Sequence, residues 1–237
     1  MQSSLSSTVR SKQTAPHPRL AALVRKHMAA EWLQPLHAPT VKAFTALEAA
    51  GVATEKKIVL DSGCGTGVST RLIARYYPDC LVIGVDKSAT RLSKLPGSHF
   101  SHRSYFHREG NTIWLRAELA SFWRLALQAG WRLHRHYLLY PNPWPKQGQV
   151  LRRWHAHPVF PALLQLGGQL ELRCNWEIYA LEFAAAVEIV AGCDVQPTEV
   201  VESCITTPFE RKYRNSGQTL YRIVVPDPVE ANEYALL

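Results

Sequence analysis

The chain has 237 residues, 46% of them hydrophobic and 19% charged, a composition that is typical of a globular protein and excludes a low-complexity or fibrous chain. No apolar run approaches the roughly 18 residues that a membrane-spanning helix needs, and there is no secretory h-region, so we expect a soluble, cytoplasmic protein. Lys and Arg outnumber Asp and Glu by 27 to 19, for a formal net charge of +8 at pH 7. This excess favours a polyanionic partner such as nucleic acid over a merely basic enzyme.

The N-terminal stretch differs in composition from the rest of the chain. Residues 1–17 are rich in Ser, Thr and Gln, and the first 30 residues contain five basic residues and no acidic one. Such a segment predicts a disordered basic tail, with an organelle transit peptide as the alternative. Residues 18–237 are expected to form a single domain, which opens with N-terminal helices over residues 18–55, near 19–33 and 40–50.

Short strands and helices alternate after residue 57. The predicted strands are 58–61, 81–86, 112–117, 136–140, 169–173, 199–203 and 219–225. The predicted helices are 69–77, 88–95, 119–129, 149–166 (interrupted near Pro158 and Pro161) and 175–191 (capped by Asn175). This alternation predicts an α/β fold with a doubly wound, mostly parallel seven-stranded sheet and helices on both faces.

A glycine-rich turn follows the first predicted strand. Asp61 precedes Gly63, Gly65 and Gly67, and Val68 stands where a dinucleotide-binding turn would have its third glycine. The turn instead resembles the D/E-x-G-x-G-x-G motif of class I S-adenosylmethionine-dependent methyltransferases, which implies their Rossmann-like fold. Glycines let the backbone approach the nucleoside, and an acid such as Asp61 can attract the sulfonium or amino group.

Acidic residues also end the next two predicted strands. Asp86 is placed to accept hydrogen bonds from both ribose hydroxyls, and Glu118 is placed to accept one from the adenine amino group. Any one of these acids could be a solvated loop residue. Their order on successive strand ends, together with the glycine turn, indicates a nucleoside cofactor, S-adenosyl-L-methionine.

A proline-rich loop follows the fourth predicted strand. Three prolines within 141–145 exclude both helix and strand, so the loop is expected to hold Asn142, Trp144 and Lys146 rigidly beside the cofactor. Residues 141–146 resemble the P-D-P-W-x-K hallmark of the tRNA (guanine-N7-)-methyltransferase family, with Asn142 in place of Asp. The N-P-P-aromatic motif of the amino-methyltransferases fits less well, because the adjacent double proline is missing.

Two later segments resemble the same tRNA methyltransferase family. Residues 174–179 are similar to its T-D-x-x-x-Y motif, again with an amide, Asn175, in place of Asp. Residues 207–222 are similar to its T-x-[FY]-E-x-K-[FY] motif and the glycine and I-Y-R that follow. The resemblance runs from about residue 59 to 223, most of the chain.

The resemblance implies methylation of guanine 46 at N7 in the tRNA variable loop. It implies one group of residues that line the cofactor: Asp61, Gly63, Gly65, Gly67, Asp86, Glu118 and Asn142, the last also in the catalytic role. It implies a second group that contacts the guanosine: Lys146, Asn175, Thr207, Phe209 and Glu210. The alternatives are a class I methyltransferase for an amino group of nucleic acid or protein, and a catalytically weak partner that binds cofactor and RNA.

Cysteines and histidines do not predict a metal site. The five cysteines form no CxxC pair, so we expect reduced, buried thiols and neither disulfides nor a zinc knuckle. Histidines gather at 134/136 and 155/157 without carboxylate or cysteine companions at ligand spacing, and a structural or RNA-facing role is expected for them. We further expect a monomer that binds tRNA and neither a membrane nor a metal.

Overall fold

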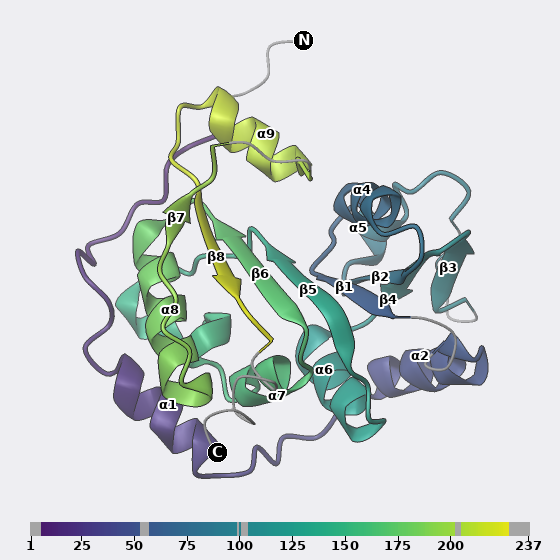
Figure 1. Cartoon of the computed structure of the whole chain (residues 1–237), viewed down its shortest axis with the longest axis horizontal. Helices are drawn as coiled ribbons and strands as arrows, with labels where there is room; N and C mark the ends of the chain where they lie inside the picture. The colour runs from purple at the N-terminus through teal and green to yellow at the C-terminus, as the bar shows by residue number, and fades with distance from the viewer. Residues whose placement is uncertain (1–5, 53–56, 99, 101–103, 202–204, 228–237) are drawn as a thin grey trace.

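The computed structural model describes residues 6–52, 57–98, 100, 104–201 and 205–227 (Figure 1). The helices are α1 (Leu20–Met28), α2 (Ala38–Ala49), α4 (Val68–Tyr76), α5 (Ala89–Leu92), α6 (Leu119–Gln128), α7 (Phe160–Gln165), α8 (Glu177–Ala191) and α9 (Pro208–Asn215), with two 3-10 turns, η1 (Gln147–Arg152) and η2 (Trp154–Ala156). The strands are β1 (Ile58–Ser62), β2 (Leu81–Asp86), β3 (Phe106–Glu109), β4 (Thr112–Arg116), β5 (Leu133–Leu139), β6 (Gln169–Cys174), β7 (Thr198–Glu199) and β8 (Tyr221–Val225).

The described strands form one sheet in the order β3-β4-β2-β1-β5-β6-β8-β7. Strands β4, β2, β1, β5 and β6 run parallel, while β3, β8 and β7 pair antiparallel with their neighbours. The prediction of a doubly wound, mostly parallel sheet is therefore confirmed. The strand order reverses between β1 and β5, and ligands of open α/β sheets bind beyond the carboxyl ends of the strands at such a switch point.

Strand β3 is the one that the seven-stranded prediction lacks. It pairs antiparallel with β4 across a turn at Gly110, whose φ is +56°. Phe106 is followed by His, Arg and Glu, and none of these side chains is buried. An edge strand of this kind has no apolar alternation, and alternation is the signal from which strands are predicted.

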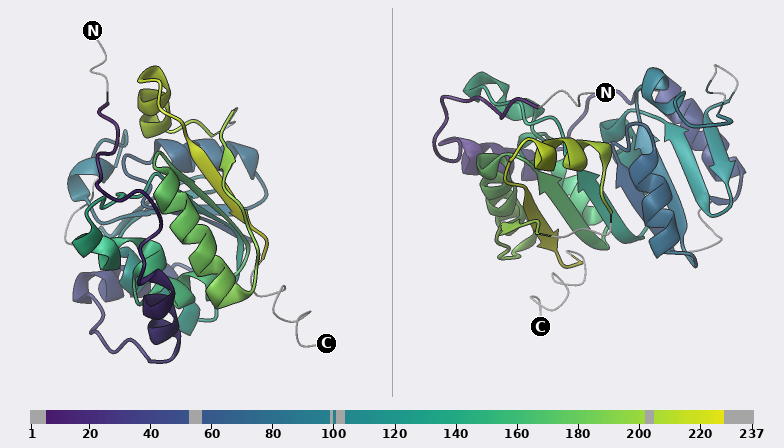
Figure 2. Two further views of the ribbon diagram at one scale, coloured as in Figure 1. Left: turned by 90° about the vertical axis from the view of Figure 1, so that its left-hand side faces the viewer. Right: turned by 90° about the horizontal axis from the view of Figure 1, so that it is seen from above.

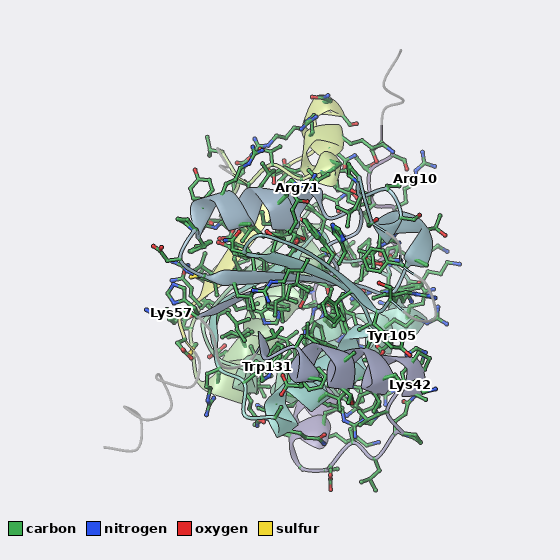
Figure 3. The ribbon with its side chains drawn as sticks, turned by 90° about the vertical axis from the view of Figure 1, so that its right-hand side faces the viewer. Arg10, Lys42, Lys57, Arg71, Tyr105 and Trp131 are labelled. Carbon is green, nitrogen blue, oxygen red and sulfur yellow. The ribbon has the colours of Figure 1, made fainter. Side chains whose placement is uncertain are left out.

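The sheet is covered on both faces, and neighbouring residues of a strand pack into different cores. Ile58 and Leu60 of β1 belong to the larger core, which also contains buried residues of α1, α2, α6, α7 and α8. Val59 belongs to a smaller core with Ile73 of α4. Figure 1 shows α4 and α2 on opposite sides of β1 and β2. Trp131 lies beside α2 (Figure 3), with its ring centroid 5.4 Å from that of Phe44.

Two predicted helices differ from the structure. Over 149–166 the chain forms η1, η2 and the short α7 in place of one interrupted helix, because Arg153 and His157 are extended, with ψ of 135° and 143°. Helix α8 starts at Glu177 with Trp176 at the N-cap and no side-chain cap, so the prediction of Asn175 as the cap is wrong. The amide of Asn175 has another partner, described below.

Helix α9 is absent from the predicted elements. Its start nevertheless carries a known signal: Thr207 accepts a hydrogen bond from the Glu210 backbone N–H at 3.0 Å, and Pro208 is the first helical residue. The strand predicted at 199–203 overlaps β7 (Thr198–Glu199) only at Glu199; residues 200 and 201 are not in a strand, and residues 202–204 lie outside the described residues.

Residues 6–17, expected to be a disordered tail, are tied down by hydrogen bonds. Ser11 Oγ donates to the Pro145 carbonyl at 2.6 Å, and the side chain of Gln13 is buried against α8. Figure 2 shows this N-terminal segment, in dark purple, running alongside α8 before it enters α1. A Ser- and Gln-rich segment has too few apolar residues to predict such docking, which here depends on polar partners distant in sequence.

Candidate functional site

The glycine turn after β1 has an open side and a packed side. Gly63, Gly65 and Gly67 have φ of +79°, +61° and +75°, a region that residues with a Cβ rarely adopt. A Cβ at Gly63 or Gly65 would have no neighbour closer than 3.9 Å, whereas one at Gly67 would lie 2.4 Å from Nε1 of Trp114. The first two glycines thus leave room for a ligand, and the third is required for packing.

Asp61 is almost fully buried beneath this turn. Its Oδ2 accepts hydrogen bonds from Ser69 Oγ at 2.6 Å and Thr70 Oγ1 at 2.7 Å, both in the first turn of α4. Burial raises the pKa of Asp61 to about 6, although these two hydroxyls act in the opposite direction. The carboxylate therefore links the end of β1 to the start of α4 through hydrogen bonds and stabilises the turn between them.

Asp86, at the end of β2, holds the turn from the side. Its Oδ2 accepts from the Gly65 N–H at 3.0 Å, and its Oδ1 accepts from the Ser88 N–H at 2.7 Å. Arg91 donates to the same Oδ2 at 3.2 Å, and its own side chain is 54% exposed. The carboxylate predicted to bind ribose hydroxyls is thus fixed in place, with a solvent-exposed arginine beside it.

Glu118 is the N-cap of α6. Its two carboxylate oxygens accept from the backbone N–H groups of Ala120 and Ser121, each at 2.8 Å, and its own N–H donates to Thr40 of α2. The carboxylate of Glu118, which is predicted to bind adenine, therefore caps α6. Because β2 and β4 are parallel neighbours, Glu118 beyond the end of β4 lies at the same edge of the sheet as Asp86 at the end of β2.

The proline loop, residues 140–146, begins where β5 ends, as the three prolines predict. Tyr140 and Trp144 have φ of +53° and +46°, and they are the non-glycine residues with positive φ in the described part of the chain. Asn142 is exposed, and its Oδ1 accepts from the Trp144 N–H at 3.4 Å. Lys146 is also exposed, so both predicted site residues face solvent.

Asn175 follows β6, the next strand in the sheet. Its side-chain Nδ2 donates to Oε1 of Gln218 at 2.9 Å, and Gln218 donates to the carbonyl of Ser6 at 2.9 Å. The amide at position 175 is therefore part of a chain of hydrogen bonds that reaches the N-terminal segment.

Helix α9 carries the remaining predicted residues, with different surroundings for each. Glu210 is fully buried, in ion pairs with Arg173 at 2.9 Å and Arg214 at 3.3 Å. Thr207 is buried as the helix cap. Phe209 is 50% exposed and stacks on Tyr213, with ring centroids 6.2 Å apart. Thr207 and Glu210 thus anchor the helix, and Phe209 is free to meet a ligand.

The predicted residues form two groups around the switch point. The first surrounds the glycine turn, where Gly65 is bonded to Asp86. The second belongs to the proline loop and α9, which meet through the rings of Tyr140 and Tyr213, 5.6 Å apart. No hydrogen bond or ion pair among the described residues joins Asn142 or Lys146 to Glu210.

A buried ionic cluster behind the proline loop was not predicted. Arg153 donates to Glu182 of α8 at 2.6 Å, and both side chains are fully buried. His155 lies 2.8 Å from the same carboxylate oxygen. Burial would raise the pKa of Glu182, but the hydrogen bonds from His155 and Arg153 outweigh it and hold the pKa at about 2. The available signal was Glu182 itself, which stands between Leu181 and Phe183 in the middle of a mostly apolar helix, because a charge buried there must be paired.

Exposed basic side chains lie on three segments that bond to one another: the N-terminal segment bonds to the proline loop through Ser11 and to the end of α9 through Ser6. Figure 3 shows Arg10 of the N-terminal segment at the end of the molecule that carries α9. The exposed basic residues of the N-terminal segment, the proline loop with η1, and α9 are Arg10, Lys12, Lys146, Arg152, Arg211 and Lys212. The guanidinium of Arg152 lies over the Trp144 ring, 4.8 Å from its centroid.

His136 and the described cysteines are buried inside the protein. His136 lies 2.8 Å from Ser62 Oγ, and burial lowers its pKa to about 3. Cys64, Cys80, Cys174 and Cys193 are buried free thiols, and Cys204 lies outside the described residues. In the ranges that the structure describes, no three His, Cys, Asp or Glu side chains gather as metal ligands, and no helix could cross a bilayer.

The chain matches a known protein family over most of its length. A family model described as "Putative methyltransferase" matches residues 55–223. The chain is 28% identical over 177 residues to a tRNA (guanine-N(7)-)-methyltransferase of Thermus thermophilus, covering 70% of this chain but only 53% of that protein. The chain therefore spans about half the length of this relative.

Two further relatives and one solved structure extend the comparison. A tRNA (guanine-N(7)-)-methyltransferase of Acidithiobacillus ferrooxidans is 26% identical over 70% of this chain and 74% of its own length. A trans-aconitate 2-methyltransferase of Rhodopseudomonas palustris is 29% identical over 76% of this chain and 82% of its own. The crystal structure of the 16S rRNA methyltransferase KamB has a TM-score of 0.52 at 18% identity over 76% of this chain and 92% of that one, which shows a shared fold.

Proposed function

The chain belongs to this methyltransferase family, and we propose that it transfers the methyl group of S-adenosyl-L-methionine to N7 of guanine 46 in the tRNA variable loop. The observation that carries the proposal is the placement of two segments on paired strands. Strands β1 and β5 are parallel, with Ser62 opposite Leu138, so the glycine turn and the proline loop emerge side by side. A donor on the first segment would lie beside an acceptor on the second.

The residues of the glycine turn fit this donor better than a dinucleotide. Gly63 and Gly65 leave open space, and the acids nearest the turn are Asp61 and Asp86. A carboxylate at Asp61, directly beneath the turn, would repel a pyrophosphate, whereas S-adenosyl-L-methionine carries no phosphate and has a positive sulfonium and amino group. We assign the ribose hydroxyls to Asp86 and the adenine end to the region of Glu118. When bound, the cofactor supplies a methyl group activated by the sulfonium.

Methylation of guanine N7 needs a loop that positions the guanine, and it needs no residue that removes a proton. Guanine N7 carries a free lone pair, so no base is needed before attack, and alignment of the reacting atoms supplies most of the acceleration. The loop 140–146 can provide this alignment because hydrogen bonds hold its backbone: the Tyr140 N–H donates to the Arg173 carbonyl at 2.7 Å, and the Trp144 carbonyl accepts from Arg153. As the purine becomes positive, the oxygen of Asn142 can accept a hydrogen bond from it, without the full charge of a carboxylate.

The surroundings of the proline loop suit an RNA substrate. The exposed basic residues of the N-terminal segment, η1 and α9 can neutralise phosphates, and release of counterions then drives binding. Phe209 offers an exposed aromatic face on which an unpaired base can stack. Lys146, Asn175, Thr207 and Glu210 complete the proposed guanosine side, the last two by holding α9 in place.

The proposal is tested with purified protein, methyl-labelled S-adenosyl-L-methionine and unmodified tRNA. We expect label in tRNA and none in a tRNA whose guanine 46 is replaced by adenine. Cofactor affinity, measured by calorimetry, should fall for Asp86→Asn and stay unchanged for Asp79→Asn, an exposed acid before β2 at the other end of that strand. Cofactor binding without any labelled tRNA, or label in another base, a protein or a small carboxylic acid, would contradict the proposed substrate.

A further inference from the structure

We propose that Arg153 is a positioning residue for methyl transfer: from inside the protein it fixes the proline loop, and Gln13 of the N-terminal segment completes its binding. The effect on methyl transfer rests on the function proposed above. The effect on the loop itself does not, and it can be measured separately.

The backbone of the loop at Trp144 needs an external restraint. Its φ of +46° is in the left-handed region, which costs free energy for any residue with a Cβ. Arg153 donates to the Trp144 carbonyl oxygen from Nε at 3.2 Å and from Nη2 at 3.1 Å. Two donors of one planar guanidinium therefore set the orientation of this carbonyl, which a single flexible donor could not do.

The position of Arg153 is itself fixed from three sides. Its side chain is fully buried, its Nη1 donates to Oε2 of Glu182 at 2.6 Å, and its guanidinium lies 4.9 Å from the centroid of the Trp176 ring. Its Nη2 also donates to Oε1 of Gln13 at 3.0 Å. The positive charge of Arg153 is compensated by Glu182, so the guanidinium is held in place without an unpaired buried ion.

The N-terminal segment takes part through two residues. Gln13 Nε2 donates to Oε1 of Glu182 at 2.6 Å, so the one side chain bonds both members of the buried ion pair. Ser11 donates to the carbonyl of Pro145, the residue after Trp144. Residues 11–13 therefore reach the proline loop both directly and through Arg153.

Fixing Trp144 also fixes the predicted catalytic side chain. The Trp144 N–H is the donor to Oδ1 of Asn142, while its carbonyl is the acceptor for Arg153. Any rotation of the Trp144 peptide groups would move the acceptor oxygen of Asn142. Arg153 does not need to touch the guanine to affect the rate, because it acts through this residue.

The test compares Arg153→Lys and Gln13→Ala with two controls. Lysine keeps the positive charge opposite Glu182 but lacks the planar guanidinium with its two donors to the Trp144 carbonyl. Arg124→Lys is the matched control, because Arg124 donates to the Gln34 carbonyl and lies over the Trp32 ring. Thr14→Ala is the control for the N-terminal segment, since Thr14 is exposed. Wild-type protein and the four variants are labelled with 5-fluorotryptophan, and each resonance compared is assigned with the corresponding Trp→Phe variant.

For Arg153→Lys we expect kcat on tRNA to fall about 100-fold, with cofactor affinity and the KM for tRNA within about twofold of wild type. For Gln13→Ala we expect a fall of about tenfold. In both variants the fluorine resonance of Trp144 should shift or broaden, while those of Trp114, Trp123 and Trp131 stay in place. The two controls should match wild type in both measurements.

A wild-type kcat together with an unmoved Trp144 resonance would overturn the inference. If Arg153→Lys does not fold, Gln13→Ala decides, because it leaves the Arg153–Glu182 ion pair intact. If wild-type protein methylates no tRNA, the proposed function has failed, yet the fluorine spectra still show whether Arg153 and Gln13 fix the loop.

Discussion

The side chain of Asn175 donates a hydrogen bond to Gln218, and Gln218 donates onward to the backbone carbonyl of Ser6. A carboxylate at position 175 could not donate, so Gln218 would have to turn its own NH2 toward it and give up Ser6. The amide at position 175, where the resembling motif has Asp, is therefore the group that lets Gln218 bond both to residue 175 and to the N-terminal segment.

Asn175→Asp should therefore weaken the attachment of the N-terminal segment. The free energy of unfolding is expected to fall by about 1 kcal/mol, the typical worth of one such hydrogen bond. Urea denaturation of Asn175→Asp, Gln218→Ala and the double variant measures this. The effects should be less than additive, because both changes break the same chain of bonds; full additivity would contradict it.

Asn142→Asp should raise turnover on tRNA. The side chain is exposed, so a carboxylate costs little there, and its charge would stabilise the positive purine that forms on methylation. We expect an increase of up to about tenfold in kcat, or about 1.4 kcal/mol of barrier. Single-turnover assays measure it, with Asn142→Ala expected to be slower than wild type. An unchanged or lower rate for the aspartate would argue for another site organisation.

Gly65→Ala and Gly67→Ala should have different effects. Both positions have positive φ, which costs about 1–2 kcal/mol for alanine. At Gly67 the methyl would also collide with the buried Trp114 ring, so thermal unfolding should show a much larger loss of stability. Gly65→Ala should stay folded and lose cofactor affinity by calorimetry. Equal losses of stability in the two variants would contradict this assignment of open and packed sides.

Glu182→Gln should alter how stability depends on pH. Because the pKa of Glu182 in the folded protein is about 2, below its usual 4.5, its contribution is present above pH 4.5 and is lost as the pH falls toward 2. At pH 7 the variant should be less stable by about 3–5 kcal/mol, since Arg153 loses its partner. The difference from wild type, measured by urea denaturation, should shrink between pH 4.5 and pH 3.

Asp61 acts in the opposite direction in the same experiment. Its pKa is raised to about 6, so it favours the folded state more as the pH falls from 6 toward 4. Wild type and Glu182→Gln both contain Asp61, so its effect cancels in the difference between their free energies of unfolding. A difference that stays constant from pH 7 to pH 3 would contradict the assignment to Glu182.

Phe209→Ala should weaken RNA binding and leave stability unchanged. The ring is half exposed on α9, and stacking of a base on such a ring is worth about 1–3 kcal/mol. Fluorescence anisotropy with labelled tRNA measures the loss. Tyr76→Ala, which changes a ring that is 54% exposed at the end of α4, is the control and should bind like wild type. Equal affinities for the two variants would exclude stacking on Phe209.

The sequence alone determined the parallel α/β sheet, the glycine turn and the end of β5 at the proline loop. Each depends on neighbouring residues: apolar runs form strands, glycines permit positive φ, and prolines end a strand. Only the tertiary structure decided that Glu210 pairs with Arg173 and that Gln13 and Arg153 meet at Glu182. These partners are 29 to 169 residues apart, and no local pattern encodes which buried charges will meet once the sheet and helices have packed.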